Sequence, residues 1–165
     1  MEFSAFIDKE GQIVRKDTGE HVFMQGDNDS SLYLIKQGIV KAYYVTDEGQ
    51  ERVKSFLTEG DVIGSTAAAY QKQPTSFGLV CLEPTTLVKF SFEKLHNATL
   101  KNHQLANELI EFLLQFAMKK EGRERELLCF SAEQRYQNLL KNQPELVDRV
   151  TQNDIARYLG VTPVA

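Results

Sequence analysis

Glycine residues divide the first half of the chain into short segments that are rich in β-branched and aromatic side chains. The glycines lie at positions 26, 38, 49, 60 and 64, so a turn is available roughly every ten residues between Gln12 and Phe92. Short strands at this spacing are typical of a small antiparallel barrel or sandwich. The runs between the glycines, such as Leu32–Ile35 and Ile39–Val45, predict the strands. Their Phe and Tyr residues predict the core of that domain rather than a cofactor site.

The sequence changes character after Glu93. From about Asn102 to Leu128 it contains no proline and only one glycine, Gly122, and it is rich in Leu, Glu, Lys and Arg, which predicts a long helix. Two apolar stripes run along this helix, and two stripes predict contact with more than the sheet alone. One stripe comprises Leu105, Leu109, Phe112 and Phe116, and the other comprises Ile110, Leu113, Leu114 and Ala117. We assign the first stripe to pairing with a second copy of the chain, because symmetric dimers are common. The alternative is a broad face buried within one chain.

A second, shorter helix is predicted from Ser131 to Leu140, and Pro144 separates it from the next segment of the chain. A third begins at Thr151, which suits an N-cap, while Asp154 is placed to return a hydrogen bond to that cap. Ile155 and Leu159 lie four residues apart and give this third helix one apolar face.

The residues after this helix predict the turn of a helix-turn-helix. Gly160 suits the left-handed conformation of a tight turn, and Thr162-Pro163 has the form of an N-cap followed by proline at the first helical position. In DNA-binding proteins this next helix enters the major groove, but here only two residues come after the proline. The predicted DNA-binding residues are Thr151, Gln152, Thr162 and Pro163. Gln152 and Thr162 are expected at phosphates, and base recognition is expected mostly beyond Ala165.

The charge of this segment is unusual for a DNA-binding unit, because the neutralisation of phosphates supplies much of the affinity. The whole chain has a formal net charge of −4. Within the last 35 residues the basic side chains are balanced by the acidic ones: Arg135, Lys141, Arg149 and Arg157 against Glu133, Glu145, Asp148 and Asp154. We therefore expect basic residues to follow Ala165 in a longer parent protein.

Cysteine usage and the absence of an apolar run predict a cytoplasmic protein with no membrane contact. Cys81 and Cys129 are far apart, and no Cys-x-x-Cys or Cys/His cluster is present. No run approaches the roughly 20 apolar residues that a membrane span requires, and the first residues do not resemble a secretion leader.

A strand-rich domain, a long helix and then a helix-turn-helix is the order found in the Crp/Fnr family of bacterial transcription regulators. Several local motifs resemble that family, from the glycine-framed strands to the helices of the DNA-binding unit. They are Gln25-Gly26-Asp27, Tyr33-Leu34-Ile35 with Gly38, Gly60–Gly64, Leu127–Ser131, Glu133–Tyr136, Leu139-Leu140, Pro144–Leu146 and Val150–Gln152. The likeness covers nearly the whole chain.

The resemblance implies an α+β fold with three parts. Residues 1–101 would form an antiparallel, jelly-roll-like β-roll of the cyclic-nucleotide-binding type, residues 102–130 a linking and dimerisation helix, and residues 131–165 an incomplete winged helix-turn-helix. It also implies a homodimer that binds double-stranded DNA and regulates transcription, with a small-molecule effector of unknown identity as a possible partner.

The chain departs from the family where nucleotide-binding members hold the cyclic phosphate. Those members have Gly-Glu-Leu and, some ten residues later, Arg-Ser/Thr-Ala, where Arg pairs with the phosphate and Glu with the ribose. Here the triplets are Gly64-Ser65-Thr66 and Thr75-Ser76-Phe77. Loss of the cation predicts that neither cyclic AMP nor cyclic GMP binds with regulatory strength. The candidate effector-pocket residues Gly64, Ser65, Thr66, Thr75 and Ser76 would then contact a different ligand or serve as turn and cap residues.

Other chemistries lack their residues in this sequence, and we predict no cofactor and no metal. Two isolated cysteines are too few for an iron–sulfur cluster, and His21, His96 and His103 form no haem or metal pattern. No catalytic motif of a hydrolase, metalloprotease or nucleotide-binding loop is present, so we expect no enzymatic activity. The alternative function is a ligand-binding or protein-interaction module that uses the same β-roll without DNA.

Overall fold

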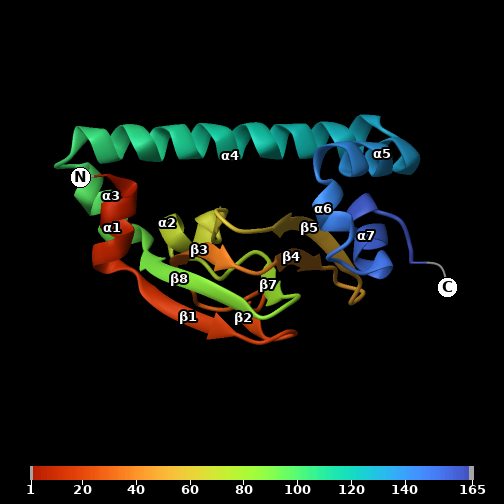
Figure 1. The fold of residues 1–165 in the computed structure, drawn as a ribbon, viewed down its shortest axis with the longest axis horizontal. Coiled ribbons are helices and arrows are strands. Elements are labelled where there is room, and N and C mark those ends of the chain that lie inside the picture. The colour runs from red at the N-terminus through yellow and green to blue at the C-terminus, as the bar shows by residue number, and fades with distance from the viewer. Residues whose placement is uncertain (1, 164–165) are drawn as a thin grey trace.

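The computed structural model describes residues 2–163, in which eight strands form two antiparallel sheets packed face to face as a β-roll (Figure 1). The first sheet has the order β1 (Gln12–Lys16), β8 (Thr85–Ser91), β3 (Ser31–Gln37) and β6 (Val62–Ile63). The second has the order β2 (His21–Phe23), β7 (Gly78–Cys81), β4 (Val40–Val45) and β5 (Glu51–Leu57). The predicted antiparallel roll is therefore confirmed.

The core between the two sheets consists of side chains that alternate with outward-facing ones along the strands. Ile35, Leu79 and Leu87 are completely or almost completely buried there, together with the rings of Phe23 and Phe77. Burial of each such side chain stabilises the fold by about 1.5–3 kcal/mol. Cys81 lies in the same core, as the sequence predicts for a small apolar residue.

Two glycines are required by the backbone and by close packing. Gly38 has a φ of +104°, and a Cβ at this position would lie 2.8 Å from the carbonyl oxygen of Pro84. Gly78 leaves space on β7 for the ring of Tyr43 from the neighbouring strand, since a Cβ there would lie 2.6 Å from that ring. The Tyr43 hydroxyl thereby lies 2.7 Å from Nε2 of His21 on β2.

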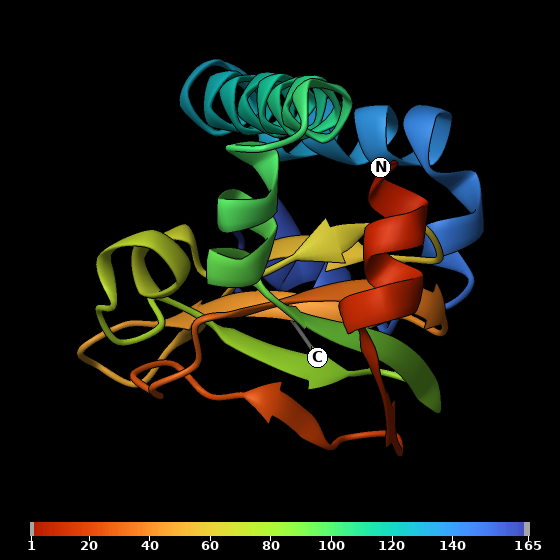
Figure 2. The ribbon, with the colours of Figure 1, turned by 90° about the vertical axis from the view of Figure 1, so that its left-hand side faces the viewer.

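Helices lie along one side of the roll and at its two ends, and the longest one crosses its whole length (Figures 1 and 2). The helices are α1 (Phe3–Glu10), α2 (Thr66–Gln71), α3 (Phe92–Thr99), α4 (His103–Cys129), α5 (Ala132–Asn142), α6 (Pro144–Val147) and α7 (Gln152–Leu159). The 27-residue α4 is capped by Asn102, whose side chain accepts a hydrogen bond from the Leu105 amide. Its bounds agree with the predicted long helix, whereas the sequence patterns do not predict α1 and α3.

The first half of α4 is anchored to the roll by a second apolar cluster. Leu105 is fully buried there among Phe6 of α1, Leu95 of α3 and Phe90 of β8. Figure 2, a view along α4, shows how α3 connects the roll to this helix. Among the helices within residues 2–163, none, α4 included, combines the length and apolar character needed to cross a bilayer.

The last three helices pack on the opposite end of the roll. Ser131 and Gln134 form a reciprocal capping box at the start of α5. This helix extends to Asn142, two residues beyond the predicted end, and Pro144 opens α6 after the predicted break. A third apolar cluster joins the roll to these helices: Ile39, Val53, Phe56, Leu139, Leu146, Ile155 and Leu159. The predicted helix-turn-helix segment therefore shares a core with the β-roll in this structure.

Substitution of Gly38 tests the turn before β4. We expect Gly38→Ala to lower the free energy of unfolding by about 3 kcal/mol, because the new Cβ meets backbone atoms and the positive φ is strained. Gly49→Ala is the matched control, since its φ is +80° but a Cβ there meets nothing within 4 Å, so a loss of about 1 kcal/mol is expected. Urea denaturation of both variants provides the measurement, and equal losses would contradict this account.

Candidate functional site

The helix α7 has the local geometry of the first helix of a helix-turn-helix. The Thr151 hydroxyl accepts a hydrogen bond from the Asp154 amide at 3.2 Å and caps the helix. Gly160 ends it in the left-handed conformation, with a φ of +74°, and the Val161 amide donates to the Ala156 carbonyl. The prediction that Asp154 returns a bond to the cap is wrong, because its carboxylate is bonded to a lysine of the β-roll instead.

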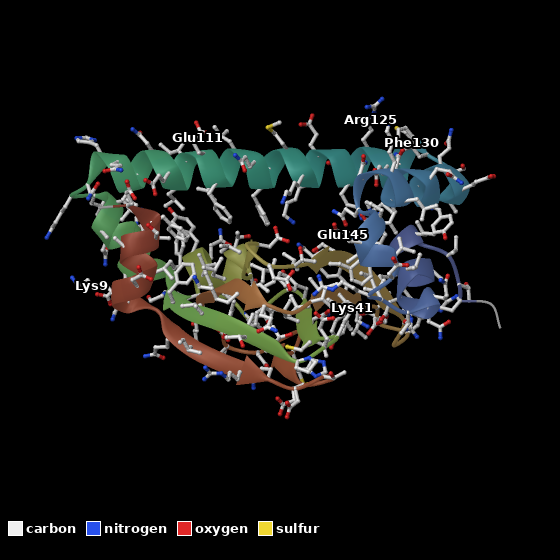
Figure 3. All side chains as sticks on the ribbon, in the orientation of Figure 1. Lys9, Lys41, Glu111, Arg125, Phe130 and Glu145 are labelled. Carbon is white, nitrogen blue, oxygen red and sulfur yellow. The ribbon has the colours of Figure 1, made fainter. Side chains whose placement is uncertain are left out.

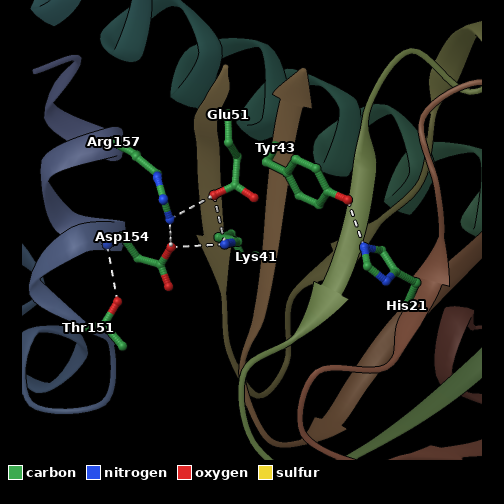
Figure 4. Close-up of polar contacts among 7 residues, drawn as sticks. All are labelled: His21, Lys41, Tyr43, Glu51, Thr151, Asp154 and Arg157. Carbon is green, nitrogen blue, oxygen red and sulfur yellow. Dashed lines mark hydrogen bonds and ion pairs between the residues drawn. The ribbon is translucent and has the colours of Figure 1, made fainter. Parts of the chain in front are cut away.

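An alternating network of charges joins α7 to strands β4 and β5 (Figure 4). Nζ of Lys41 lies 2.9 Å from Oδ1 of Asp154 and 2.9 Å from Oε2 of Glu51. Arg157 lies 3.3 Å from the same Glu51 oxygen and 3.5 Å from Oδ1 of Asp154. Lys41 and Asp154 are only 7% and 5% exposed, so each charge depends on the other for compensation.

Two arginines hold the ends of the helices together through backbone carbonyl groups. Arg123 of α4 donates to the carbonyl oxygens of Val53 in β5 and Tyr158 in α7, and its guanidinium lies 3.7 Å from the centre of the Tyr158 ring. Burial lowers the pKa of Arg123. Arg135 of α5 donates to the carbonyls of Phe130 and Leu159, at the ends of α4 and α7.

A third arginine ties the end of α6 to two loops of the roll. Arg149 forms ion pairs with Glu59, at 3.1 Å, and with Glu83. Hydrogen bonds from Arg149 and from the Gly38 amide hold the pKa of Glu59 at about 2, well below its usual range. Of the four basic residues between positions 131 and 163, only Lys141 has no such contact in the described structure.

The predicted DNA-binding residues lie at the two ends of α7. Thr151, Gln152 and Thr162 are exposed and Pro163 is half-buried. Thr162 and Pro163 are not helical, and Val164 and Ala165 lie outside the described residues, as does the remainder of the predicted second helix.

The predicted effector-pocket residues are brought together, but their polar groups are engaged in local structure. Ser65 is buried, and its Oγ accepts two hydrogen bonds. One comes from the Ala68 amide and caps α2, and the other comes from the Ser76 amide. The Thr75 hydroxyl is buried and donates to the Met24 carbonyl at 2.7 Å. Gly64 and Thr66 line a cavity instead. Phe77 is buried in the inter-sheet core next to these residues.

This cavity has a volume of about 570 Å³ and lies between the roll, α2, α3 and α4. Most of its lining is apolar and includes Leu32, Ile63, Tyr70 and Phe92. Four residues of α4 line the same cavity: Leu109, Phe112, Leu113 and Phe116. Leu105 is buried in the adjoining core. Leu105 is buried within the chain, so its assignment to a dimer surface does not fit this structure. Leu109, Phe112 and Phe116 border the cavity, and their assignment stays a prediction.

The exposed apolar side of α4 carries most of the other stripe, and Leu113 lies at the edge of this side because it also lines the cavity. Ile110, Leu113, Leu114 and Met118 are 54%, 42%, 55% and 68% exposed. They follow one another at intervals of three, one and four residues, so they form a continuous strip along the helix. In Figure 3 the side chain of Arg125 also points away from the roll, which marks this outer side of α4 farther along the helix.

Sequence reasoning missed Lys54. In the pairing of β4 with β5, Ala42 faces Ser55 and Tyr43 faces Val53, so Lys54 is the extra residue of a β-bulge. A bulge turns a side chain out of the regular alternation. Nζ of Lys54 lies 4.9 Å from the centre of the Phe77 ring and 5.8 Å from that of Phe116 on α4. Burial, together with the charge of Lys120, lowers the pKa of Lys54 to about 7.

Residues 13–102 match the family model of the cyclic nucleotide-binding domain. The transcriptional activator protein Anr of Pseudomonas protegens is 26% identical over an alignment covering 94% of this chain and 66% of that protein. The fumarate and nitrate reduction regulatory protein of Salmonella typhi is 28% identical, covering 87% of this chain and 61% of that protein. The chain thus spans less than two thirds of the length of these two curated relatives, which are named as regulators and not as enzymes.

Solved structures share this fold at low sequence identity. FixK2 from Bradyrhizobium japonicum superimposes with a TM-score of 0.79 at 18% identity, covering 92% of this chain and 78% of that one. The c-di-GMP responsive global regulator CLP of Xanthomonas campestris gives the same TM-score at 19% identity, covering 96% of this chain and 84% of that one.

Within residues 2–163 of the present chain, no three His, Cys, Asp or Glu side chains converge so that they could hold a metal ion.

A double-mutant cycle tests the ion pair that links α7 to the roll. We expect Lys41→Met and Asp154→Leu each to lower the free energy of unfolding by about 2–4 kcal/mol, because each leaves a buried charge with too few partners. The double variant should lose less than the sum, with a coupling of about 1–3 kcal/mol in urea denaturation. The exposed pair Lys72–Glu93 is the control, with an expected coupling below about 1 kcal/mol. Additive losses at Lys41 and Asp154 would refute the linkage.

The pH dependence of stability tests the environment of Lys54. Its pKa is about 7 in the folded chain and about 10.5 when unfolded, so the unfolded state binds more protons between these values and stability rises with pH there. We expect Lys54→Met to flatten that rise and to be the more stable protein at pH 6, by about 2 kcal/mol. Lys36→Met, at an exposed position, is the matched control. The measurement is urea denaturation from pH 6 to 10 in buffers free of multivalent anions, and an unchanged curve for Lys54→Met would contradict the assignment.

Proposed function

Because the chain belongs to the cyclic nucleotide-binding domain family, we propose that it is the sensing and coupling part of a DNA-binding transcription regulator of the Crp/Fnr type. The observation that carries this proposal is α7. It is capped at Thr151, closed by a left-handed glycine at Gly160, and connected through α5 to a 27-residue helix that spans the roll. The division into residues 1–101, 102–130 and 131–165 belongs to this proposal.

In this proposal α7 crosses the DNA backbone, and the second helix that the sequence predicts after Thr162 enters the major groove. Thr151 and Gln152 at the start of α7 are exposed and suited to phosphate contacts, as is Thr162 after the turn.

The second part of the proposal is a homodimer formed through the outer strip of α4. Ile110, Leu113, Leu114 and Met118 offer an exposed apolar surface on a straight helix, and two such helices bury this surface against each other. A symmetric pair then presents two DNA-binding units to half-sites about 34 Å apart. We prefer this strip to the stripe of Leu105, Leu109, Phe112 and Phe116 as the proposed dimer surface, because Leu105 is buried within the chain.

The effector of this regulator is not a cyclic nucleotide. Thr75 stands where the family has the phosphate-binding arginine, and its hydroxyl is already bonded to Met24. Phe77 occupies the adjoining space in the core. No cofactor or membrane contact is part of the proposal, and the cytoplasm is the proposed location.

In this proposal the chain with α7 packed on the β-roll is a resting state that has low affinity for DNA. Arg149 and Arg157 are paired with Glu59, Glu83, Glu51 and Asp154, so their charge is compensated within the chain. Release of α5–α7 from the roll makes these charges available to phosphates, and counterion release then strengthens binding.

A mobility-shift assay with the longest polypeptide that the gene encodes tests this function. We expect binding to duplex DNA that weakens by roughly 100-fold between about 50 and 200 mM salt. Leu114→Glu should disrupt the dimer and weaken DNA binding at least about 10-fold, whereas Gln115→Glu, which adds the same charge beside the strip, should have little effect on either. Sedimentation measures the dimer in parallel. A folded protein that ignores DNA at low salt would overturn the proposal.

A further inference from the structure

Lys54 is a partly buried lysine that contacts two aromatic rings but forms no ion pair within the described chain. Lys41, a fully buried lysine on the neighbouring strand, has carboxylates of Glu51 and Asp154 at 2.9 Å. By contrast, none of the ion pairs within residues 2–163 includes Lys54 or Lys120. Lysines that are withdrawn from water are usually paired, because an isolated charge in an apolar setting is costly.

The neighbour of Lys54 is a second cation. Lys120 projects from α4, and its Nζ lies 4.9 Å from the centre of the Phe116 ring, the same ring that Lys54 approaches. The proximity of the two ammonium groups contributes to the lowered pKa of Lys54. Two positive charges beside one ring repel each other. An anion between the two ammonium groups would offset this repulsion and give each of them an oppositely charged partner.

Phe116 also lines the apolar cavity of about 570 Å³ beneath α4. Lys54 and Lys120 do not line the cavity themselves, but both approach the ring of Phe116, which does. A ligand held by the lysines would therefore reach apolar space past this ring. We propose that Lys54 and Lys120 bind the carboxylate of a small amphiphilic acid whose apolar body occupies this cavity. The inference rests on the proposed regulatory function only for its role as an effector site, since the binding itself requires neither DNA nor a dimer.

The position of this site connects it to α7. Lys120 lies three residues, or about one helical turn, before Arg123, and Lys54 follows Val53, whose carbonyl Arg123 contacts. Arg123 also holds the Tyr158 carbonyl of α7. An anion that draws Lys120 and Lys54 together acts on the joint of α4, β5 and α7, which is where an effector has to act to release the docked helices.

The experiment is calorimetric titration of this chain with octanoate, with acetate and octanol as probes of the charged group and the apolar body alone. We expect octanoate to bind at least 10-fold more tightly than either probe. Lys54→Met and Lys120→Met should each weaken octanoate binding at least 10-fold and leave the weak octanol binding unchanged. Lys119→Met is the matched control, because Lys119 is adjacent on α4 but pairs with Asp61 at 3.6 Å, and it should bind octanoate like the parent chain.

Circular dichroism and thermal melting confirm that each variant is folded, and Lys120→Met, at an exposed position, carries the test if Lys54→Met does not fold. Any of three results would overturn the proposal. The folded parent chain does not bind octanoate, octanol binds as tightly as octanoate, or the folded lysine variants bind octanoate like the parent chain. These outcomes leave the salt-dependent DNA binding of the longer polypeptide untouched, so failure of this site and failure of the regulatory function are separate results.

Discussion

The arrangement of the C-terminal helices depends on the buried ion pair between Lys41 and Asp154. These residues are 113 positions apart in sequence, and the bond between them fixes α7 to β4, the strand next to the edge strand β5. Around the pair, Ile155 and Leu159 pack on Val53 and Phe56 of β5. A buried pair of this kind contributes little net stability compared with apolar side chains of the same size, but it strongly disfavours any position of α7 that separates the charges. The network thus specifies one docking geometry, and the apolar contacts supply most of its stability.

The cost of burying an unpaired charge distinguishes two lysines on neighbouring strands. Lys41 points toward α7 and finds two carboxylates, whereas the bulge in β5 turns Lys54 toward α4, where its neighbours are aromatic rings and another lysine. Protein interiors leave few charges uncompensated, so a difference of this kind between adjacent strands marks the second lysine as a place where something from outside the chain belongs.

Much of the fold is encoded in local sequence signals. The glycine spacing predicts the strands of the roll, and the capping residues Ser131 and Thr151 predict where α5 and α7 begin, because turns and caps depend on residues close in sequence. The role predicted for Asp154 is wrong because its partner lies on a distant strand. The assignment of Leu105 to a dimer surface does not fit the structure for a related reason: periodicity identifies an apolar face but not what covers it. Lys54 carries no local signal at all, since a bulge depends on the register between two strands.

The long helix α4 has a mechanical consequence. With 27 residues at 1.5 Å each it extends about 40 Å, and it is clamped at its start by Leu105 and at its end by Arg135, which binds the carbonyl at Phe130. A rod held in this way behaves as a lever. A tilt of only about 5° about the Leu105 end displaces the far end by roughly 3 Å, about the length of a hydrogen bond. A change too small to disturb the packing of the roll is thereby large enough to break the contacts of Arg123 and Arg135 with α7.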